Sequence, residues 1–301
     1  MEARQLRYFV TTAETLSFSE AGRRHYLSQS ALSQQIKALE NEIGSPLFIR
    51  TTHNVVLTES GKHLLKYARV ALQALDECAA RMNDIKGLHC GELKIGLTAS
   101  QEPFIRETGI EFLKAYKGVK TSVCYSTIDN LMQKLRAHEL DMVFSVMPSG
   151  NMDGIDYEYL LEYKLSAIMR TCHPLANRSK LSFSDIREQR LVLPEGDVKE
   201  RNGLERFIGI DTGKLDVAVT INDVNAILNL LQETDMISIL TAQSIISRPF
   251  LKAIEIEELS EPIKSYVFFA SDTYRKLAAE QMLQMFKETA IPKAKMLLSL
   301  S

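Results

Sequence analysis

Apolar residues recur at intervals of three and four along the first sixty residues, which predicts a series of short helices. The first helix has one apolar face, formed by Leu6, Phe9, Val10, Ala13 and Leu16. Ser17 or Ser19 is suited to cap a second helix over about 20–26, because a serine hydroxyl accepts a free N–H of the first turn. Ser28 is suited in the same way to begin a third helix over about 29–43. Gly44 follows as its stop signal.

The third predicted helix has two different faces. Its inward side carries Ala31, Leu32, Ile36, Leu39 and Ile43. Its outer and N-terminal side carries Gln29, Ser30, Ser33, Gln34 and Lys37. Glutamine bonds the edge groups of adenine, serine pairs with several bases, and lysine reaches guanine or phosphate. A helix-turn-helix places such residues in the major groove of DNA. The alternative is an ordinary surface helix with a solvated polar side.

A small hairpin is predicted after this helix. Residues 46–50 and 55–57 read as strands, and residues 51–54 form the turn between them. This arrangement is a wing, with Arg50 and His53 on the side of the DNA. The alternative is a hairpin that only covers the core.

A long helix with a heptad seam follows, from about residue 58 to 87. The seam residues are spaced alternately by four and three: Leu64, Ala68, Ala71, Leu75, Cys78, Met82 and Ile85. Thr58 is a plausible N-cap and Gly87 follows the last turn. A single helix of this kind would leave its apolar stripe in water, although each buried leucine or isoleucine contributes about 1.5–3 kcal/mol. The pattern therefore favours a dimerisation helix; packing on a neighbouring domain of the same chain is the alternative.

The period changes after residue 91, where strands alternate with helices. Strands are predicted at 93–97, 119–125, 141–145, 163–170, 190–194, 215–222, 236–240, 251–257 and 264–270. Helices are predicted after Ser100 and after Thr127, and at 183–188, 199–208, 223–233, 241–247 and 273–289. This alternation indicates a mostly parallel sheet covered on both faces. About 210 residues are too many for one small sheet, so two α/β lobes with a cleft are expected.

Parallel strands bring their carboxyl ends, and the next helix N-termini, to one edge where ligands bind. The segments 98–101, 126–127 and 193–197 qualify, and the last contains Glu195 and Gly196. Hydroxyl groups and free N–H groups at helix starts favour an anion such as a carboxylate. The alternative for each serine or threonine is simple helix capping.

Composition limits the possible classes of protein. The chain has 301 residues, 45% hydrophobic residues and a net charge of −2, and its apolar runs are too short to span a bilayer. No signal peptide is recognisable at the N-terminus. Four scattered cysteines argue against a zinc site and a disulfide framework, which fits a cytoplasmic protein. Residues 1–62 hold seven Lys or Arg and six Glu, a balance of +1, so charge alone predicts no nucleic-acid binding.

Nothing in the sequence indicates catalysis or a bound cofactor. The six histidines are dispersed, and Gly-x-Ser-x-Gly, His-Glu-x-x-His and phosphate-loop patterns do not occur. We therefore expect no enzyme activity, no metal and no cofactor.

The N-terminal sixty residues resemble the DNA-binding domain of LysR-type transcriptional regulators. The matching motifs are Leu6-Arg7-Tyr8-Phe9, Ser17-Phe18-Ser19, Leu27–Ile36, Leu39-Glu40, Leu47–Arg50 and Leu57–Gly61. The resemblance implies a winged helix-turn-helix bound to double-stranded DNA as a dimer, with tetramers on adjacent sites. Three positions depart from it: Gly22 replaces an alanine, His25 replaces a core leucine, and His53 replaces a basic residue of the wing. Tyr26 or Leu27 could then supply the packing that His25 does not.

Residues 91–301 resemble the effector domain of the same family more loosely, through Leu140-Asp141, His173–Ala176 and Asn222. This resemblance implies a fold like that of type II periplasmic binding proteins, with a small-molecule effector between the lobes. By position, Thr98, Ser100, Gln101 and Thr127 match effector-contacting segments. Thr234 and Met236 replace a Gly-x-Gly, so that turn must differ.

The combined expectation is an α/β protein of three parts. They are a winged helix-turn-helix (1–58), a linker and dimerisation helix (59–87) and a two-lobed effector domain (91–301). Lobe I would take about 91–160 and 265–301, and lobe II about 161–264. The function expected is sequence-specific transcriptional regulation under the control of a small molecule. A solute-binding protein, or another ligand-binding protein without a role on DNA, is the alternative.

Overall fold

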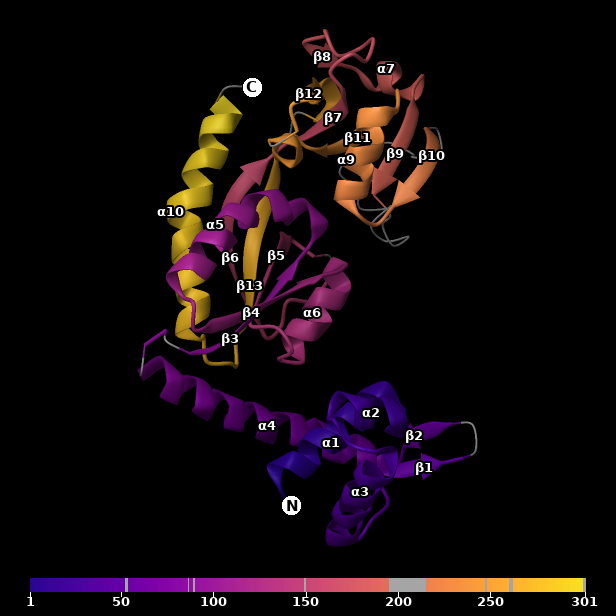
Figure 1. Cartoon of the computed structure of the whole chain (residues 1–301), viewed down its shortest axis with the longest axis vertical. Coiled ribbons are helices and arrows are strands. Elements are labelled where there is room, and N and C mark those ends of the chain that lie inside the picture. Colours follow the sequence, from indigo (N-terminus) through magenta and orange to yellow (C-terminus); the bar gives the residue numbers. More distant parts are fainter. Residues whose placement is uncertain are drawn as a thin grey trace. The chain divides into compact units, whose positions relative to one another are not determined.

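The computed structural model describes residues 1–51, 54–85, 87–88, 90–148, 150–194, 215–246, 248–259 and 262–299. The chain divides into two compact units, residues 1–85 and 86–301, and each is described by itself (Figure 1). The helix predicted at 199–208 lies outside the described residues.

The first unit is a winged helix-turn-helix joined to a long helix. Its elements are α1 (Ala3–Thr15), α2 (Phe18–Arg24), α3 (Gln29–Ile43), β1 (Phe48–Arg50), β2 (Val55–Leu57) and α4 (Glu59–Ile85). The predicted caps are present: the hydroxyls of Ser17 and Ser28 accept the N–H groups of Glu20 and Ala31, each at 3.2 Å. Gly44 ends α3 in the left-handed region, with φ of 77°. Helix α2 begins two residues earlier than predicted.

One apolar core holds the first unit together. It contains Phe9, Leu32, Ile36, Leu39 and Leu47, each fully buried. Two residues predicted to face it do not. Leu16 ends α1 with φ of 48°, which turns its side chain out of the apolar stripe and leaves it 48% exposed. Ile43 is 38% exposed at the last turn of α3, where the chain leaves the helix.

Helix α4 packs closely on the strand pair. Strands β1 and β2 are antiparallel, with Phe48 opposite Leu57 and Arg50 opposite Val55. The hydroxyl of Thr58 accepts the N–H of Gly61 at 2.9 Å, which confirms the predicted cap. A Cβ atom at Gly61 would lie only 2.2 Å from the carbonyl oxygen of Leu47. Glycine at this position therefore sets how closely α4 approaches β1.

The second unit begins with lobe I, a five-stranded sheet in the order β4-β3-β5-β13-β6. Its elements are β3 (Gly91–Leu97), η1 (Ala99–Gln101), α5 (Glu102–Ala115), β4 (Val119–Tyr125), α6 (Ile128–Arg136), β5 (Met142–Val146), β6 (Ile155–Tyr163), β13 (Ile263–Ala270) and α10 (Leu277–Ser299). Helices α5 and α10 cover one face of the sheet, and α6 covers the other (Figure 1). The alternating side chains of the strands thus enter two separate apolar clusters.

Lobe II is built around a four-stranded sheet in the order β11-β7-β12-β8 and a separate parallel pair, β9 with β10. Its elements are β7 (Leu165–Arg170), β8 (Lys180–Leu181), α7 (Phe183–Arg187), β9 (Arg190–Pro194), β10 (Asp216–Ile221), α9 (Val224–Glu233), β11 (Ser238–Thr241), η3 (Ala242–Ile245), β12 (Leu251–Ile256) and η4 (Glu257–Leu259). The predicted helix over 241–247 is only this short 3₁₀ turn, η3. Neither Thr234 nor Met236 adopts a positive φ. The turn therefore differs from the family's Gly-x-Gly turn, as the sequence predicted.

The expectation of a mostly parallel sheet was wrong for half of the second unit. Strands β4, β3 and β5 are parallel, but β13 is antiparallel to both β5 and β6, and β7 is antiparallel to both β11 and β12. Sequence reasoning also missed β6, whose pattern does not alternate cleanly because Leu160 and Leu161 are both buried. A bulge opposite Ser265 and Tyr266 lets two consecutive residues turn inward. Helix α10 starts at Leu277 rather than 273 and continues past 289.

The contact at Gly61 gives a stability test. Gly61→Ala should destabilise the first unit by about 1–3 kcal/mol, because the added methyl group must push α4 away from the Leu47 carbonyl. Gly109→Ala, inside α5 with its nearest atom 4.0 Å away, is the matched control. It should stabilise by about 0.5–1 kcal/mol through the helix propensity of alanine. Urea unfolding measures both, and equal effects of the two substitutions would contradict the close approach.

Candidate DNA-reading surface and effector site

Helix α3 presents its polar side to solvent. Leu32, Ile36 and Leu39 are fully buried against α1 and α2, so the opposite side of the helix faces outward. Four of the predicted reading residues are exposed there, namely Gln29, Ser30, Gln34 and Lys37. The fifth, Ser33, is half-buried. The fold therefore places these five side chains on one surface that can enter a groove.

A tight junction sets the angle between α2 and α3. The N–H of Leu27 donates to the carbonyl oxygen of Gly22 at 2.9 Å. A Cβ atom at Gly22 would lie 2.8 Å from the carbonyl oxygen of Leu27. The sequence suggested only a weakened helix at this glycine, whereas the structure shows a close backbone approach that glycine permits.

His25 has a polar role at the edge of the core. Its Nε2 lies 2.8 Å from the hydroxyl of Thr11, and its ring packs edge-on against Tyr8 at 4.9 Å. Leu27 packs against the apolar core as the sequence suggested, but Tyr26 does not, because it is 97% exposed with φ of 55°. Burial lowers the pKa of His25, and the positive charge of Arg7 lowers it further.

The wing begins beside α3. Arg50 lies at the end of β1 and contacts three groups of its own domain: Phe18, Ser33 and Glu40. His53, the other predicted residue of the wing, lies outside the described residues.

Helix α4 carries its apolar seam in two parts. The first part belongs to the domain core, since Ala68 is fully buried and Leu64 is half-buried against it. The intrachain alternative therefore holds for these two residues. Beyond them, Leu75, Met82 and Ile85 are 50%, 51% and 76% exposed, and Ala71 and Cys78 are also exposed.

Two predicted effector segments lie side by side in lobe I. Strands β3 and β4 are parallel with Leu97 opposite Tyr125, so both carboxyl ends reach the same edge. The N–H of Ser126 donates to the carbonyl oxygen of Leu97 at 3.3 Å. Thr98 follows the end of β3 directly, and Thr127 lies two residues after the end of β4. The third predicted segment, with Glu195 and Gly196, lies outside the described residues.

Thr127 does not serve as a side-chain cap. It stands at the N-cap position of α6, yet its side chain makes no capping hydrogen bond, and the same is true of Thr98 before η1. The simple capping alternative therefore does not account for these two residues. Thr98 and Ser100 are half-buried, and their hydroxyls lie 3.4 Å apart.

Gln101 differs from its neighbours because it is buried and fully engaged. Its side-chain oxygen accepts the hydroxyl of Ser265 at 2.5 Å. Its side-chain nitrogen donates to Ser100 and to the phenol of Tyr163, each at 3.4 Å. Burial raises the pKa of Tyr163 to about 12, so this phenol stays protonated at neutral pH. Gln101 thus links the start of α5 to β6 and β13 and holds Ser100 in place.

Sequence reasoning did not single out Tyr163, Ser265 and Ser145 as residues near this site. Tyr163 on β6 and Ser265 on β13 bond to Gln101, and the pairing of these strands cannot be read from sequence spacing. Ser145 follows Phe144, whose carbonyl oxygen accepts the N–H of Thr98 at 3.2 Å. The Ser145 hydroxyl is buried and has no hydrogen-bond partner among the described residues.

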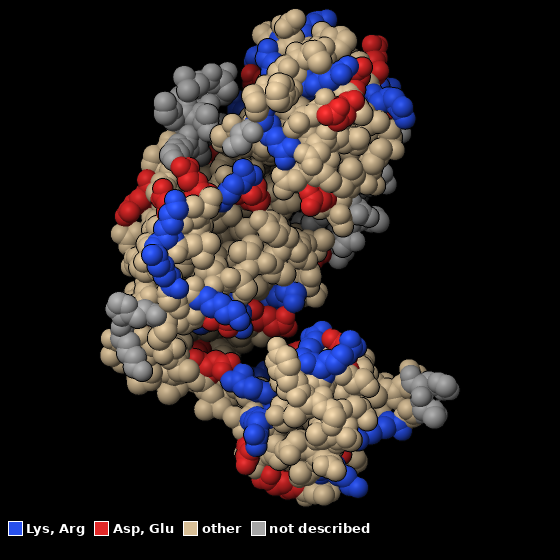
Figure 2. All heavy atoms as spheres, in the orientation of Figure 1, with Lys and Arg blue, Asp and Glu red and all other residues tan. Residues whose placement is uncertain are grey.

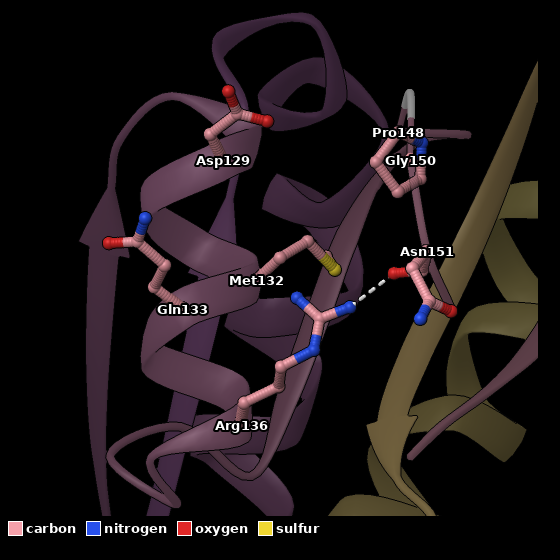
Figure 3. A pocket seen from close by; sticks show the side chains of 7 residues that line it. All are labelled: Asp129, Met132, Gln133, Arg136, Pro148, Gly150 and Asn151. Atoms are coloured by element: carbon pink, nitrogen blue, oxygen red, sulfur yellow. Dashed lines mark hydrogen bonds between the residues drawn. The ribbon is translucent and has the colours of Figure 1, made fainter. Parts of the chain in front are cut away.

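A small pocket lies beside α6 (Figure 3). Its volume is about 150 Å³, and its lining comes from α6 and from the segment between β5 and β6: Asp129, Met132, Gln133, Arg136, Pro148, Gly150 and Asn151. Arg136 donates to the carbonyl oxygen of Asn151 at 2.5 Å and so ties that segment to the helix. The pocket contains none of the predicted effector residues.

Neither the charge distribution nor the metal-ligating residues point to a further site in the described part of the chain. Acidic and basic side chains are interspersed over the face shown in Figure 2. Within the described part of the chain, no group of three or more His, Cys, Asp or Glu is placed to hold a metal ion. No described helix has the length and apolar character needed to cross a membrane.

Winged helix-turn-helix, long helix and two-lobed domain together define a class of DNA-binding regulators, and comparisons identify the family. Residues 3–62 match the helix-turn-helix domain of bacterial regulatory proteins of the lysR family. Residues 86–291 match the LysR substrate binding domain. The chain therefore belongs to the LysR family of DNA-binding transcriptional regulators, which carry an effector-binding domain.

Individual proteins similar to this chain are also transcriptional regulators. The RuBisCO operon transcriptional regulator of Allochromatium vinosum is 31% identical over 204 residues, 68% of this chain and 67% of that protein. The transcriptional activator CmpR of Synechocystis is 26% identical over 283 residues, 93% of this chain and 92% of that protein. The structure of full-length CbnR in complex with its target DNA shares the fold. Its TM-score is 0.62 at 23% identity, with 98% of this chain and 100% of CbnR covered.

The position of His25 predicts a pH dependence. The unfolded chain titrates near the ordinary histidine pKa of about 6.5, and the folded pKa lies lower. Stability from neutral His25 is therefore complete above about pH 6.5 and is lost as the pH falls through the folded pKa.

We expect the wild-type first unit to lose more stability than a His25→Leu variant when the pH falls from about 7.5 to about 5.5. Thermal unfolding at a series of pH values measures this. The pKa of His173 in the second unit is also lowered, and it is common to both proteins. Identical pH profiles for the two proteins would contradict the assignment to His25.

Proposed function

We propose that this regulator reads DNA with the outer side of α3, pairs with a second copy through α4, and binds a small anion at the strand ends of lobe I. The observation that carries the effector site is the arrangement of Thr98, Ser100 and Thr127 at one sheet edge, where neither threonine side chain caps its helix. Gln101 supports this site by positioning Ser100 rather than by direct contact.

The DNA contacts proposed are Gln29, Ser30, Ser33, Gln34 and Lys37. Their exposure on α3 and the family membership support this set. His53 remains an expectation from the sequence, and Arg50 is considered further below.

The chemistry of the effector site favours a carboxylate or another small anion. Helix α6 starts beside Thr98, and the first N–H groups of a helix attract negative charge. The hydroxyl groups nearby supply neutral hydrogen bonds that orient such a ligand. Glu195 and Gly196 lie outside the described residues and remain expectations from the sequence, which would place the effector between the lobes. A change in the lobe angle would then pass along α4 to the spacing of the two half-sites.

A thermal-shift screen of small carboxylates and amino acids tests the effector site. A compound that raises the Tm of the wild-type protein should raise it less, or not at all, in Ser100→Ala and Thr127→Ala. Both variants should keep their affinity for DNA, since neither residue lies in the first unit. Ser122→Ala on the exposed part of β4 is the matched control and should respond like the wild type. Full responses in both site variants would remove these hydroxyls from the effector site.

The second half of the α4 seam gives a dimer test. Leu75→Asp should break the dimer, because it puts a charge into the exposed apolar stripe that continues through Met82 and Ile85. Lys66→Asp, on the opposite side of α4, should leave the dimer intact. Light scattering of the full chain measures the oligomeric state of both variants. A dimeric Leu75→Asp protein would refute the role of this stripe in dimerisation.

A further inference from the structure

Arg50 is folded back onto its own domain. One guanidinium nitrogen donates to the hydroxyl oxygen of Ser33 at 2.7 Å, and another lies 3.2 Å from a carboxylate oxygen of Glu40. The guanidinium carbon stands 4.3 Å from the centre of the Phe18 ring. A planar group held on two edges and one face has little freedom to turn toward solvent.

Glu40 fixes the other end of this arrangement. Its second carboxylate oxygen accepts the N–H of Leu47 at 2.8 Å and that of Phe48 at 3.3 Å. The Glu40 side chain is only 14% exposed, whereas the side chains of Glu42, Asp76 and Glu59, which also form ion pairs in this unit, are 52%, 59% and 80% exposed. Arg50 could leave only by abandoning a largely buried carboxylate, which is costly.

We propose that Arg50 is a positioning residue for base recognition and not an anchor for a DNA phosphate. The Arg50 N–H occupies an acceptor site of the Ser33 oxygen, so the hydroxyl hydrogen of Ser33 is left to point elsewhere. The positive charge also strengthens that O–H as a donor. Ser33 on the groove side of α3 would then select a base with an acceptor there, such as purine N7, guanine O6 or thymine O4.

This inference rests on the proposed function, in which α3 reads the major groove. It differs from the usual role of a wing arginine, which is to neutralise a phosphate and release a counterion. The two roles depend on different properties of the side chain. A phosphate anchor needs only the charge, whereas positioning needs the guanidinium fork that reaches Ser33 and Glu40 together.

The experiment uses the full chain and two DNA probes. One is the duplex that the wild-type protein selects most strongly from a randomised library, and the other is a scrambled duplex of the same composition. Affinities for both are measured over a range of salt concentrations. The variants are Arg50→Lys, Ser33→Ala and Glu40→Gln, and the control Lys37→Gln removes an exposed charge on α3.

Arg50→Lys keeps the charge and should still lose about tenfold in affinity for the selected duplex, the scale of one base contact. Its affinity for the scrambled duplex and its salt dependence should stay at the wild-type values. Selection with Arg50→Lys should lose base preference at the same position as selection with Ser33→Ala. The double variant should be no weaker than either single variant. Lys37→Gln should instead lower the salt dependence.

Glu40→Gln tests the same arrangement from the other side. It removes the charged partner of Arg50 while an amide oxygen can still accept the Leu47 N–H. The freed guanidinium should then reach a phosphate, so binding to the scrambled duplex should tighten and become more dependent on salt by a slope of about 0.9. This gain cannot arise from partial unfolding, which would weaken binding to both probes equally.

Two results would overturn the inference. One is an Arg50→Lys protein with wild-type affinity and base preference for the selected duplex. The other is a Ser33→Ala protein that selects the wild-type sequence while Gln34→Ala does not. If neither Ser33→Ala nor Gln34→Ala changes the selected sequence, the reading role of α3 itself fails, and the inference fails with it.

Discussion

The first unit depends on the burial of one side of α3. Leu32, Ile36 and Leu39 are fully buried against α1 and α2, and this packing decides which side of the helix remains outside. Each such side chain contributes about 1.5–3 kcal/mol when buried, so the helix has no alternative rotation of similar stability. The polar residues on its other side therefore have one fixed presentation. The wing adds to this constraint, because Glu40 on α3 binds the N–H groups at the start of β1.

In lobe I, hydrogen bonding distinguishes side chains that hold the fold from side chains that do not cap the helices at whose starts they stand. Gln101 is the clearest supporting residue, because both ends of its amide are engaged and it is 1% exposed. Thr98 and Thr127 stand at strand ends without capping bonds. Ser145 nearby has a buried hydroxyl with no partner among the described residues, so one polar group close to this sheet edge lacks a hydrogen bond.

The boundaries and caps of the helices in the first unit were predictable to within two residues, because they depend on neighbours in sequence. The span of α3, with Ser28 as its cap and Gly44 as its end, agrees with the periodic pattern to the residue. Sheet architecture was not predictable in the same way. The pairing of β13 with β5 and β6 joins residues at least a hundred positions apart, and it runs antiparallel where alternation suggested parallel strands. The strand β6 was missed because a bulge lets both Leu160 and Leu161 face the core.

The sequence by itself determined the class of protein, the two-sided character of α3 and the apolar stripe of α4, because each depends on local periodicity and on motifs at fixed spacing. Only the tertiary structure decided what individual side chains do within these elements. The sequence suggested Arg50 and Gln101 as ligand contacts, and the structure adds the groups that hold them: Glu40 bonds Arg50, and Ser265 bonds Gln101. The physical reason is that a polar side chain satisfies its hydrogen bonds with whatever the fold brings near it, and that neighbourhood is set by long-range packing.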